Sequence, residues 1–348
     1  MAIAPRPQDG APVPALWRRA LRNATLLATL VVLLALLLVA RDLEALAAVL
    51  AQLPLATLAS LACHLPQILF TAIAWQLLLP ASHRPGLHRL SLLRWYREAA
   101  DALLPAGSLL GQAAVMRLLA RGGTPGEEAA ASGTAAMLLE SVSQLAFILL
   151  GFALLLILGI DGGHGWVAAG VGLALFSVVA LGLLLHPLGL RLLRAGLARL
   201  ARRFPRLDPA WLDEAEAALR RIQGARGALA LSAFLNLLAW GMGAVEVWLV
   251  LLLLGQPVSL AEALVIESVA MTLRNLGFML PGAAGVQEGA FVAAGALLGV
   301  PAAAALSLAL VRRAREVLLV GLPGLLAWRR AELRAMRQDS KGAARSLA

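Results

Sequence analysis

The stretch Leu280-Pro-Gly-Ala-Ala-Gly-Val-Gln-Glu-Gly289 separates two apolar segments, residues 259–279 and 290–299. A helix needs about 20 residues to cross a hydrocarbon core of about 30 Å, so neither segment crosses a bilayer comfortably. A membrane tolerates broken backbone only where that backbone is buried in protein or lines a watery cavity. We therefore interpret this stretch as the break in a re-entrant or discontinuous helix, and as half of a binding site.

A second stretch with the same character, Leu104-Pro-Ala-Gly-Ser-Leu-Leu-Gly-Gln112, occurs earlier in the chain. When the two prolines are superimposed, one arginine before them and one glutamine after them match to within one residue. A glutamate follows each proline by 35 residues. Paired interrupted segments are typical of transporters built from repeats, so we predict an internal repeat. The matched pairs are Pro105 with Pro281, Arg97 with Arg274, Gln112 with Gln287, and Glu140 with Glu316.

The composition indicates a polytopic membrane protein. The 348 residues are 60% hydrophobic and 14% charged, and the mean hydropathy is +0.81. Soluble domains carry about 25% charged residues. The net charge of +10 comes from cations that cluster between apolar runs, which is typical of cytoplasmic loops and argues against nucleic-acid binding. Cys63 and the scattered histidines form no ligand set, and no catalytic constellation stands out, so we expect no metal, no cofactor and no enzymatic activity.

Six apolar runs are predicted to cross the membrane, with the two broken elements between them. Each half of the chain then crosses three times, and an odd number of crossings inverts the second half relative to the first. The predicted fold class is therefore all-α, with about six full spans and two broken or re-entrant helices, in an inverted repeat of two three-span halves. The predicted spans are residues 24–40, 55–79, 124–158, 166–185, 228–254 and 301–327.

The charges between the spans divide a single integral membrane domain, residues 1–348, into five parts. Arginine-rich segments are predicted to face the cytoplasm, because cytoplasmic loops carry an excess of Lys and Arg. The parts are a cytoplasmic tail (1–23), a first half that includes the fourth span (24–186), a basic cytoplasmic loop (187–227), the rest of the second half (228–328) and a second cytoplasmic tail (329–348).

The last span carries three arginines and a glutamate inside apolar sequence. An arginine at the bilayer centre costs at least about 2.5 kcal/mol, so three of them are not expected to face lipid. Arg312 and Glu316 are four residues apart and are predicted to pair on one helix face. Arg312, Arg315 and Glu316 are predicted to line a polar cavity beside the 281–289 break. The alternative is a buried ion-pair network that only fixes the packing.

Arg313 points away from that face and is predicted to meet Glu288, Glu267 or Glu246. An arginine that faces a cavity presents a fork of donors that matches phosphate or carboxylate. The acids would orient the arginines, recognise a cationic or hydroxylated headgroup, or carry protons, and the sequence leaves these roles open. The candidate substrate-binding residues are Arg97, Glu98, Pro105, Gln112, Glu140, Arg274, Pro281, Gly282, Gly285, Gln287, Glu288, Arg312, Arg315 and Glu316.

The 280–289 stretch and the Arg312-Arg-Ala-Arg-Glu316 segment behind it resemble the flippase-like family, the integral-membrane region of lysylphosphatidylglycerol synthetases and their stand-alone relatives. Trp95-Tyr-Arg-Glu98, with Leu104-Pro105, and the tail Gly321–Trp328 look closest to the hopanoid-biosynthesis-associated branch. The resemblance covers about residues 90–330. It implies lipid translocation, or lipid-linked accessory work, in a bacterial inner membrane.

The leading hypothesis is a flippase or transporter for a lipid with a polar headgroup, with a hopanoid lipid as one candidate. A second hypothesis is a non-transporting scaffold that docks lipid-modifying enzymes through the 187–227 loop. A third is an intramembrane lipid transferase, although we find no nucleophile or metal set for one. The expected partners are a membrane lipid, the bilayer and lipid-biosynthesis enzymes, with no nucleic acid. The chain leaves no room for the soluble aminoacyl-transfer domain of full synthetases, so we do not expect an aminoacyl-lipid synthase.

The topology is testable because the chain has one cysteine, Cys63. The N-terminus, residues 81–97, residues 187–227 and the C-terminus are all predicted to face the cytoplasm. Single cysteines introduced on a Cys63→Ala background should react with an impermeant thiol reagent only after the membrane is opened. Labelling of a cysteine at position 206 from the periplasmic side of intact cells would contradict this topology.

Overall fold

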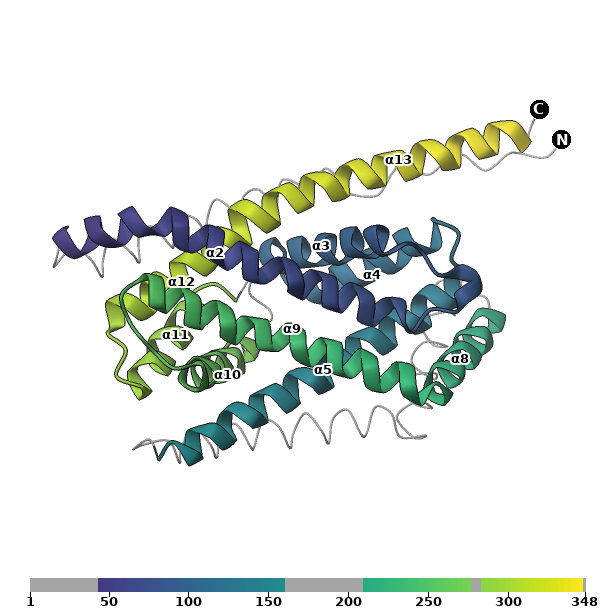
Figure 1. Cartoon of the computed structure of the whole chain (residues 1–348). Helices are drawn as coiled ribbons and strands as arrows, with labels where there is room; N and C mark the ends of the chain where they lie inside the picture. The colour runs from purple at the N-terminus through teal and green to yellow at the C-terminus, as the bar shows by residue number, and fades with distance from the viewer. Residues whose placement is uncertain (1–42, 160–208, 277–282, 347–348) are drawn as a thin grey trace.

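The computed structural model describes residues 43–159, 209–276 and 283–346, and within these ranges every regular element is a helix (Figure 1). Three described helices are long and apolar enough to cross a membrane. They are α2 (Leu43–Gln76), through its part Leu53–Gln76, α5 (Gly126–Ile157) and α9 (Arg226–Leu253). The described part of the chain is therefore all-helical, with helices suited to a bilayer.

These three helices coincide with the predicted spans 55–79, 124–158 and 228–254. The predicted spans 24–40 and 166–185 lie outside the described residues. The remaining one, 301–327, is helical but composite. It consists of α12 (Ala302–Ala314), the π-helix η3 (Arg315–Gly321) and the start of α13 (Leu322–Ser346). Six full crossings stay a prediction.

Each predicted break separates two helices that pack against each other. In the first half, α3 (Leu87–Leu103) is followed after three residues by α4 (Gly107–Ala120). In the second half, α10 (Leu260–Leu276) is followed by α11 (Val286–Leu297). The predicted interruptions are confirmed: the chain turns at both proline motifs instead of continuing as one helix.

The two breaks share an unusual backbone conformation. Ala106 and Ala283 have φ values of 48° and 49°, and they are the non-glycine residues with positive φ in the described part of the chain. A residue with a Cβ atom adopts this left-handed backbone conformation only at an energetic cost, so the conformation persists only where the surrounding structure enforces it. Each alanine follows its proline by one or two residues. The two halves therefore turn in a similar way at matched positions.

Small residues allow the first hairpin to close tightly. A Cβ atom on Gly107 would lie 2.0 Å from the carbonyl oxygen of Ala100, and one on Gly111 would lie 2.8 Å from the Ala100 Cβ. Neither position has room for a methyl group, because the contacted atoms belong to the α3 backbone or to its buried face. These glycines bring α4 against α3 at the break.

The core lies where α9 packs against α2, α5 and α10 (Figure 1). Its largest fully buried side chains include Phe147, Phe152 and Phe291. Many leucines on the outward faces of the long helices are instead exposed, among them Leu55, Leu58, Leu65, Leu149, Leu150 and Leu156. An exposed apolar belt of this kind suits contact with lipid chains. Many polar and charged side chains are instead buried in the interior.

We expect Gly107→Ala to lower the melting temperature of the detergent-solubilised protein, because overpacking a tight contact costs about 1–3 kcal/mol. Gly289→Ala is the matched control, since a Cβ at Gly289 meets nothing within 4 Å. Alanine also favours a helix over glycine by up to about 1 kcal/mol, so the control should melt at or above the wild-type temperature. Equal melting of both variants and wild type would contradict the tight-hairpin packing.

Candidate functional site

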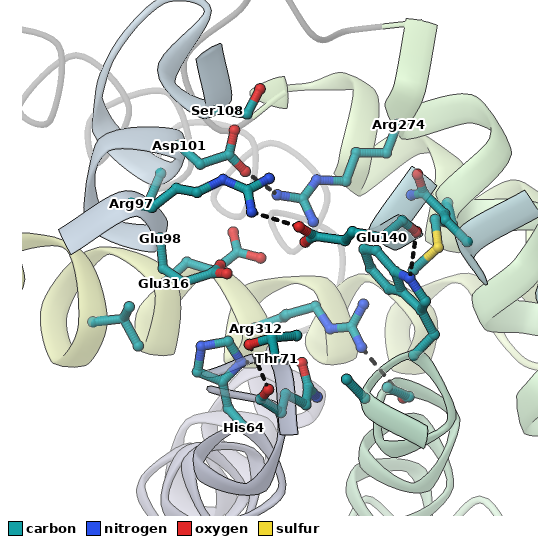
Figure 2. Close-up of a pocket in the computed structure, with 18 of the residues that line it drawn as sticks. His64, Thr71, Arg97, Glu98, Asp101, Ser108, Glu140, Arg274, Arg312 and Glu316 are labelled. Atoms are coloured by element: carbon teal, nitrogen blue, oxygen red, sulfur yellow. Dashed lines mark hydrogen bonds and ion pairs between the residues drawn. The ribbon is translucent and has the colours of Figure 1, made fainter. Parts of the chain in front are cut away.

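A cavity of about 270 Å³ lies between the two hairpins and the long helices (Figure 2). Its lining residues come from α2, α3, α4, α5, α9, α10, α12 and η3, together with Ala283. Its lining is dominated by charge, with five arginines and six carboxylates. These are Arg94, Arg97, Arg274, Arg312 and Arg315, and Glu98, Asp101, Glu140, Glu246, Glu267 and Glu316.

Glu140 of α5 organises the wall formed by the first half. Arg94 of α3 donates to both carboxylate oxygens of Glu140, each at 3.1 Å, and Arg97 donates to Glu140 Oε2 at 2.5 Å. Arg94 also donates to Thr71 Oγ1 at 3.0 Å and pairs with Glu98 at 3.2 Å. Hydrogen-bonded arginine–carboxylate pairs are the strong kind of polar contact, and here they join α3 to α5. The hydrogen bond from Arg94 to the Thr71 hydroxyl adds α2.

Arg312 organises the wall formed by the second half. Its Nη1 donates to Glu267 Oε1 and Oε2 at 2.9 and 2.8 Å. Its Nε and Nη2 donate to Glu246 Oε1 and Oε2 at 3.3 and 3.2 Å, and Nη2 also donates to the Gly243 carbonyl oxygen. The guanidinium lies 5.0 Å from the centre of the Phe291 ring. Arg312 therefore connects α12 to α9 and α10, and all three of its guanidinium nitrogens donate hydrogen bonds.

The predicted pairing of Arg312 with Glu316 is wrong. Glu316 instead pairs with Arg313 at 3.3 Å and accepts hydrogen bonds from Gln287 Nε2 at 3.2 Å. The prediction assumed α-helical geometry, whereas a π-helix starts at Arg315 and its wider turn changes which side chains share a face. Arg313 also pairs with Glu288 at 2.8 Å, one of its three predicted partners.

The ends of the two hairpins meet at one side of the cavity. Asp101, near the end of α3, lies 3.5 Å from Arg274, near the end of α10 (Figure 2). Their side chains are 39% and 31% exposed, far more than those of Arg312 and its partners. Next to them, Gln144 Nε2 lies 3.4 Å from Asn275 Oδ1. On this side of the cavity, where the lining side chains are more exposed, polar contacts connect the two halves of the chain.

The structure brings seven of the candidate residues together around the cavity: Arg97, Glu98, Glu140, Arg274, Arg312, Arg315 and Glu316. Three others lie behind the lining. Gln112 donates to the Gly133 carbonyl oxygen at 2.9 Å, and Gln287 donates to Glu316. Glu288 pairs with Arg313 and accepts from the Gly285 backbone N–H at 2.8 Å.

The remaining candidates belong to the breaks. Pro105 and Gly285 are exposed in the turns and do not line the cavity. Pro281 and Gly282 lie outside the described residues. The residues that line this cavity therefore do not include Pro105, Gln112, Gly285, Gln287 and Glu288, and their part in substrate binding stays a prediction. Pro105 and Gly285 are exposed because they lie in the turns, whereas the other three are buried and bond to neighbouring groups behind the lining.

Several lining residues were absent from the predicted site. His64, Gln67 and Thr71 of α2 line the cavity, as does Arg94 of α3. Their signal was present in the sequence, because residues 64, 67 and 71 are spaced three and four apart and form a polar stripe on an apolar span. Arg94, Arg97, Glu98 and Asp101 show the same spacing.

Glu246 and Glu267 were considered only as partners of Arg313, but they belong to the site as partners of Arg312. Each lies in a mostly apolar part of its helix, and such a charge does not reveal which distant helix supplies its partner.

Comparison with known families gives one match. The model of the lysylphosphatidylglycerol synthase TM region matches residues 25–324, which is most of the chain and includes every described residue of the cavity. No curated protein and no solved structure matches the chain.

Arg312→Met should strongly reduce the thermal stability and membrane abundance of the protein. The change strands two buried carboxylates, and breaking a buried ion pair costs about 3–5 kcal/mol. Adding Glu267→Gln should recover part of the loss, because it removes one of those charges. Arg117→Gln is the control: Arg117 pairs with Glu332, but its side chain is 56% exposed, and exposed pairs contribute about 0–1 kcal/mol. Wild-type stability of Arg312→Met would contradict a packing role for this network.

Proposed function

Because this chain belongs to the family of the lysylphosphatidylglycerol synthase TM region, we propose that it moves a lipid with a polar headgroup across or within a bacterial inner membrane. The observation that supports this is the charged cavity enclosed by helices whose outer faces are apolar. The protein would act as a transporter rather than as an enzyme. A hopanoid lipid is one candidate substrate in this proposal.

The cavity provides hydrogen-bond donors and acceptors that can replace the hydration a lipid headgroup loses when it leaves water. A charged group in hydrocarbon costs several kcal/mol unless it is paired or hydrated. The cavity-lining arginines and carboxylates supply donors and acceptors that replace that hydration. The chains of the lipid would stay outside, against the exposed leucines. Intramembrane charges that face a cavity rather than lipid commonly mark a substrate path.

We also propose that the two halves form an inverted repeat with six full spans and with both termini in the cytoplasm. The support is the matched pair of hairpins, each with a left-handed alanine at its break. In transporters built this way, binding sites lie at the interface of the repeats and open alternately to the two sides. The contact between Asp101 and Arg274 joins the two hairpin ends, so opening on that side would require this ion pair to separate.

The scaffold alternative would use the basic loop 187–227. The described part of that loop is α8 (Pro209–Gly224), which buries Ala218 and Ile222 against the chain's own helices. Arg221 of α8 also pairs with Glu128 of α5. This face of the loop is therefore occupied within the chain, which favours a transporter over a docking platform.

Reconstituted protein should accelerate translocation of headgroup-labelled lipids in vesicles, measured by quenching of the label in the outer leaflet. A panel of phospholipids and a hopanoid lipid would identify the preferred headgroup. Protein-containing vesicles with the same rate as empty vesicles for the whole panel would contradict the transport proposal.

Cross-linking tests whether the hairpin ends must separate. The double variant Asp101→Cys, Arg274→Cys on a Cys63→Ala background, joined by a short cleavable thiol cross-linker, should lose translocation and regain it on cleavage. The matched control joins Arg117→Cys to Glu332→Cys, a pair that links α4 to α13 away from the cavity. Undiminished translocation with the 101–274 cross-link in place would show that this contact does not open.

A further inference from the structure

Arg315 differs from the other arginines of the cavity in its hydrogen bonding. It is 4% exposed, yet its Nε and Nη1 have no hydrogen-bond partner. Its closest carboxylate oxygens are Glu246 Oε2, 3.5 Å from Nη1, and Glu316 Oε1, 3.7 Å from Nη2. Both distances exceed the usual N–H···O range of about 2.7–3.2 Å. The guanidinium is held near two acids without being hydrogen-bonded to them.

The two acids near Arg315 already accept hydrogen bonds from other groups. Glu246 accepts from Ser60 and Arg312, and Glu316 accepts from Gln287 and Arg313. Arg312, by contrast, uses its Nε and both Nη atoms on neighbouring oxygens. Among the arginines that line the cavity, Arg315 is therefore the one with buried donors that have no hydrogen-bond partner.

The α2 wall of the cavity carries two more polar atoms without partners. His64 Nδ1 lies 3.2 Å from Gln67 Oε1, and since that oxygen can only accept, Nδ1 carries the proton. Gln67 Nε2 is then a free donor, and it is buried without a partner, as is His64 Nε2. Both residues line the cavity together with Arg315.

We propose that Gln67 and Arg315 form an oxyanion subsite in this cavity, with His64 as a positioning residue that fixes the Gln67 amide. The proposal rests on the proposed function in that its occupant is the phosphodiester of a lipid headgroup; a free phosphate presents the same chemistry. The arginine supplies charged N–H donors at Nε and Nη1, and the amide supplies one more at Nε2. A phosphodiester carries only acceptors, which matches this set.

The energetic case is that buried donors without acceptors are costly, and more so when they are charged. Native proteins leave few such groups, so the buried, unpartnered donors of Gln67 and Arg315 favour an occupant that carries acceptors. Because five arginines face six carboxylates in the lining, the subsite would hold an oxyanion by directed hydrogen bonds and not by a surplus of positive charge. Water alone is the competing occupant, since the cavity is roomy and polar enough to hold it.

Thermal melting of the purified full chain in detergent tests the subsite, with three probes titrated separately. These are dihexanoyl-phosphatidylglycerol, dihexanoylglycerol and inorganic phosphate. The first should raise the melting temperature and the second, which lacks the phosphate, should not. Gln67→Met and Arg315→Gln should each weaken the apparent affinity for the phospholipid about tenfold or more, the effect of losing hydrogen bonds to a charged group. Arg117→Gln, far from the cavity, should bind as the wild type does.

Stabilisation by inorganic phosphate that disappears in Gln67→Met would support the subsite and assign it to a free anion. Equal affinity of wild type and Gln67→Met for the phospholipid, or equal stabilisation by dihexanoylglycerol, would overturn it and leave water as the occupant. If Arg315→Gln fails to fold, Gln67→Met decides alone, since it removes one amide at nearly constant size. If the wild-type protein binds the phospholipid but does not translocate lipid, the transport proposal fails and the subsite stands. If the wild-type protein translocates lipid and Gln67→Met binds the phospholipid with unchanged affinity, the subsite proposal fails and the transport proposal stands.

Discussion

The arrangement depends on the pairing of Arg312 with Glu246 and Glu267. These three buried charges come from α12, α9 and α10, and none of them could remain charged in an apolar interior without the others. Their pairing fixes the second hairpin against the long helices, and the contacts of Glu140 with Arg94 and Arg97 do the same for the first. The cavity between the two networks is polar because both halves place their charges there.

The breaks could be predicted from the sequence because their cause is local. Pro105 and the Pro/Gly-rich 280–289 stretch interrupt apolar helices, and the structure turns at both places. The presence of Arg315 and Glu316 at a cavity also followed from the cost of exposing charge to lipid. The pairing within the last span could not be predicted, because it depends on a π-helix that starts at Arg315. The partners of Arg312 come from helices 45 and 66 residues away, a relation that no local pattern encodes.

The two kinds of arginine in the cavity have different consequences. The donors of Arg94 and Arg312 are used by neighbouring acids, a hydroxyl and a carbonyl oxygen, so these arginines act as structural links between helices. Arg315 retains unused donors beside Gln67 and His64, so it is suited to contact another molecule. Some arginines of the cluster therefore stabilise the packing of the helices, and another is suited to binding. The distinction depends on whether the N–H donors of each arginine are already hydrogen-bonded, since all of them carry the same charge.

The central claim is that a lipid headgroup occupies the cavity. Photo-cross-linking tests it most directly, with a lipid whose photoreactive group is on the headgroup, added to the protein in lipid nanodiscs and followed by peptide mapping. The account predicts labelled peptides that contain the uncharged lining residues Met137 of α5 and Met271 of α10. Labelling confined to the outer faces, at exposed residues such as Leu149 or Leu231, would contradict it.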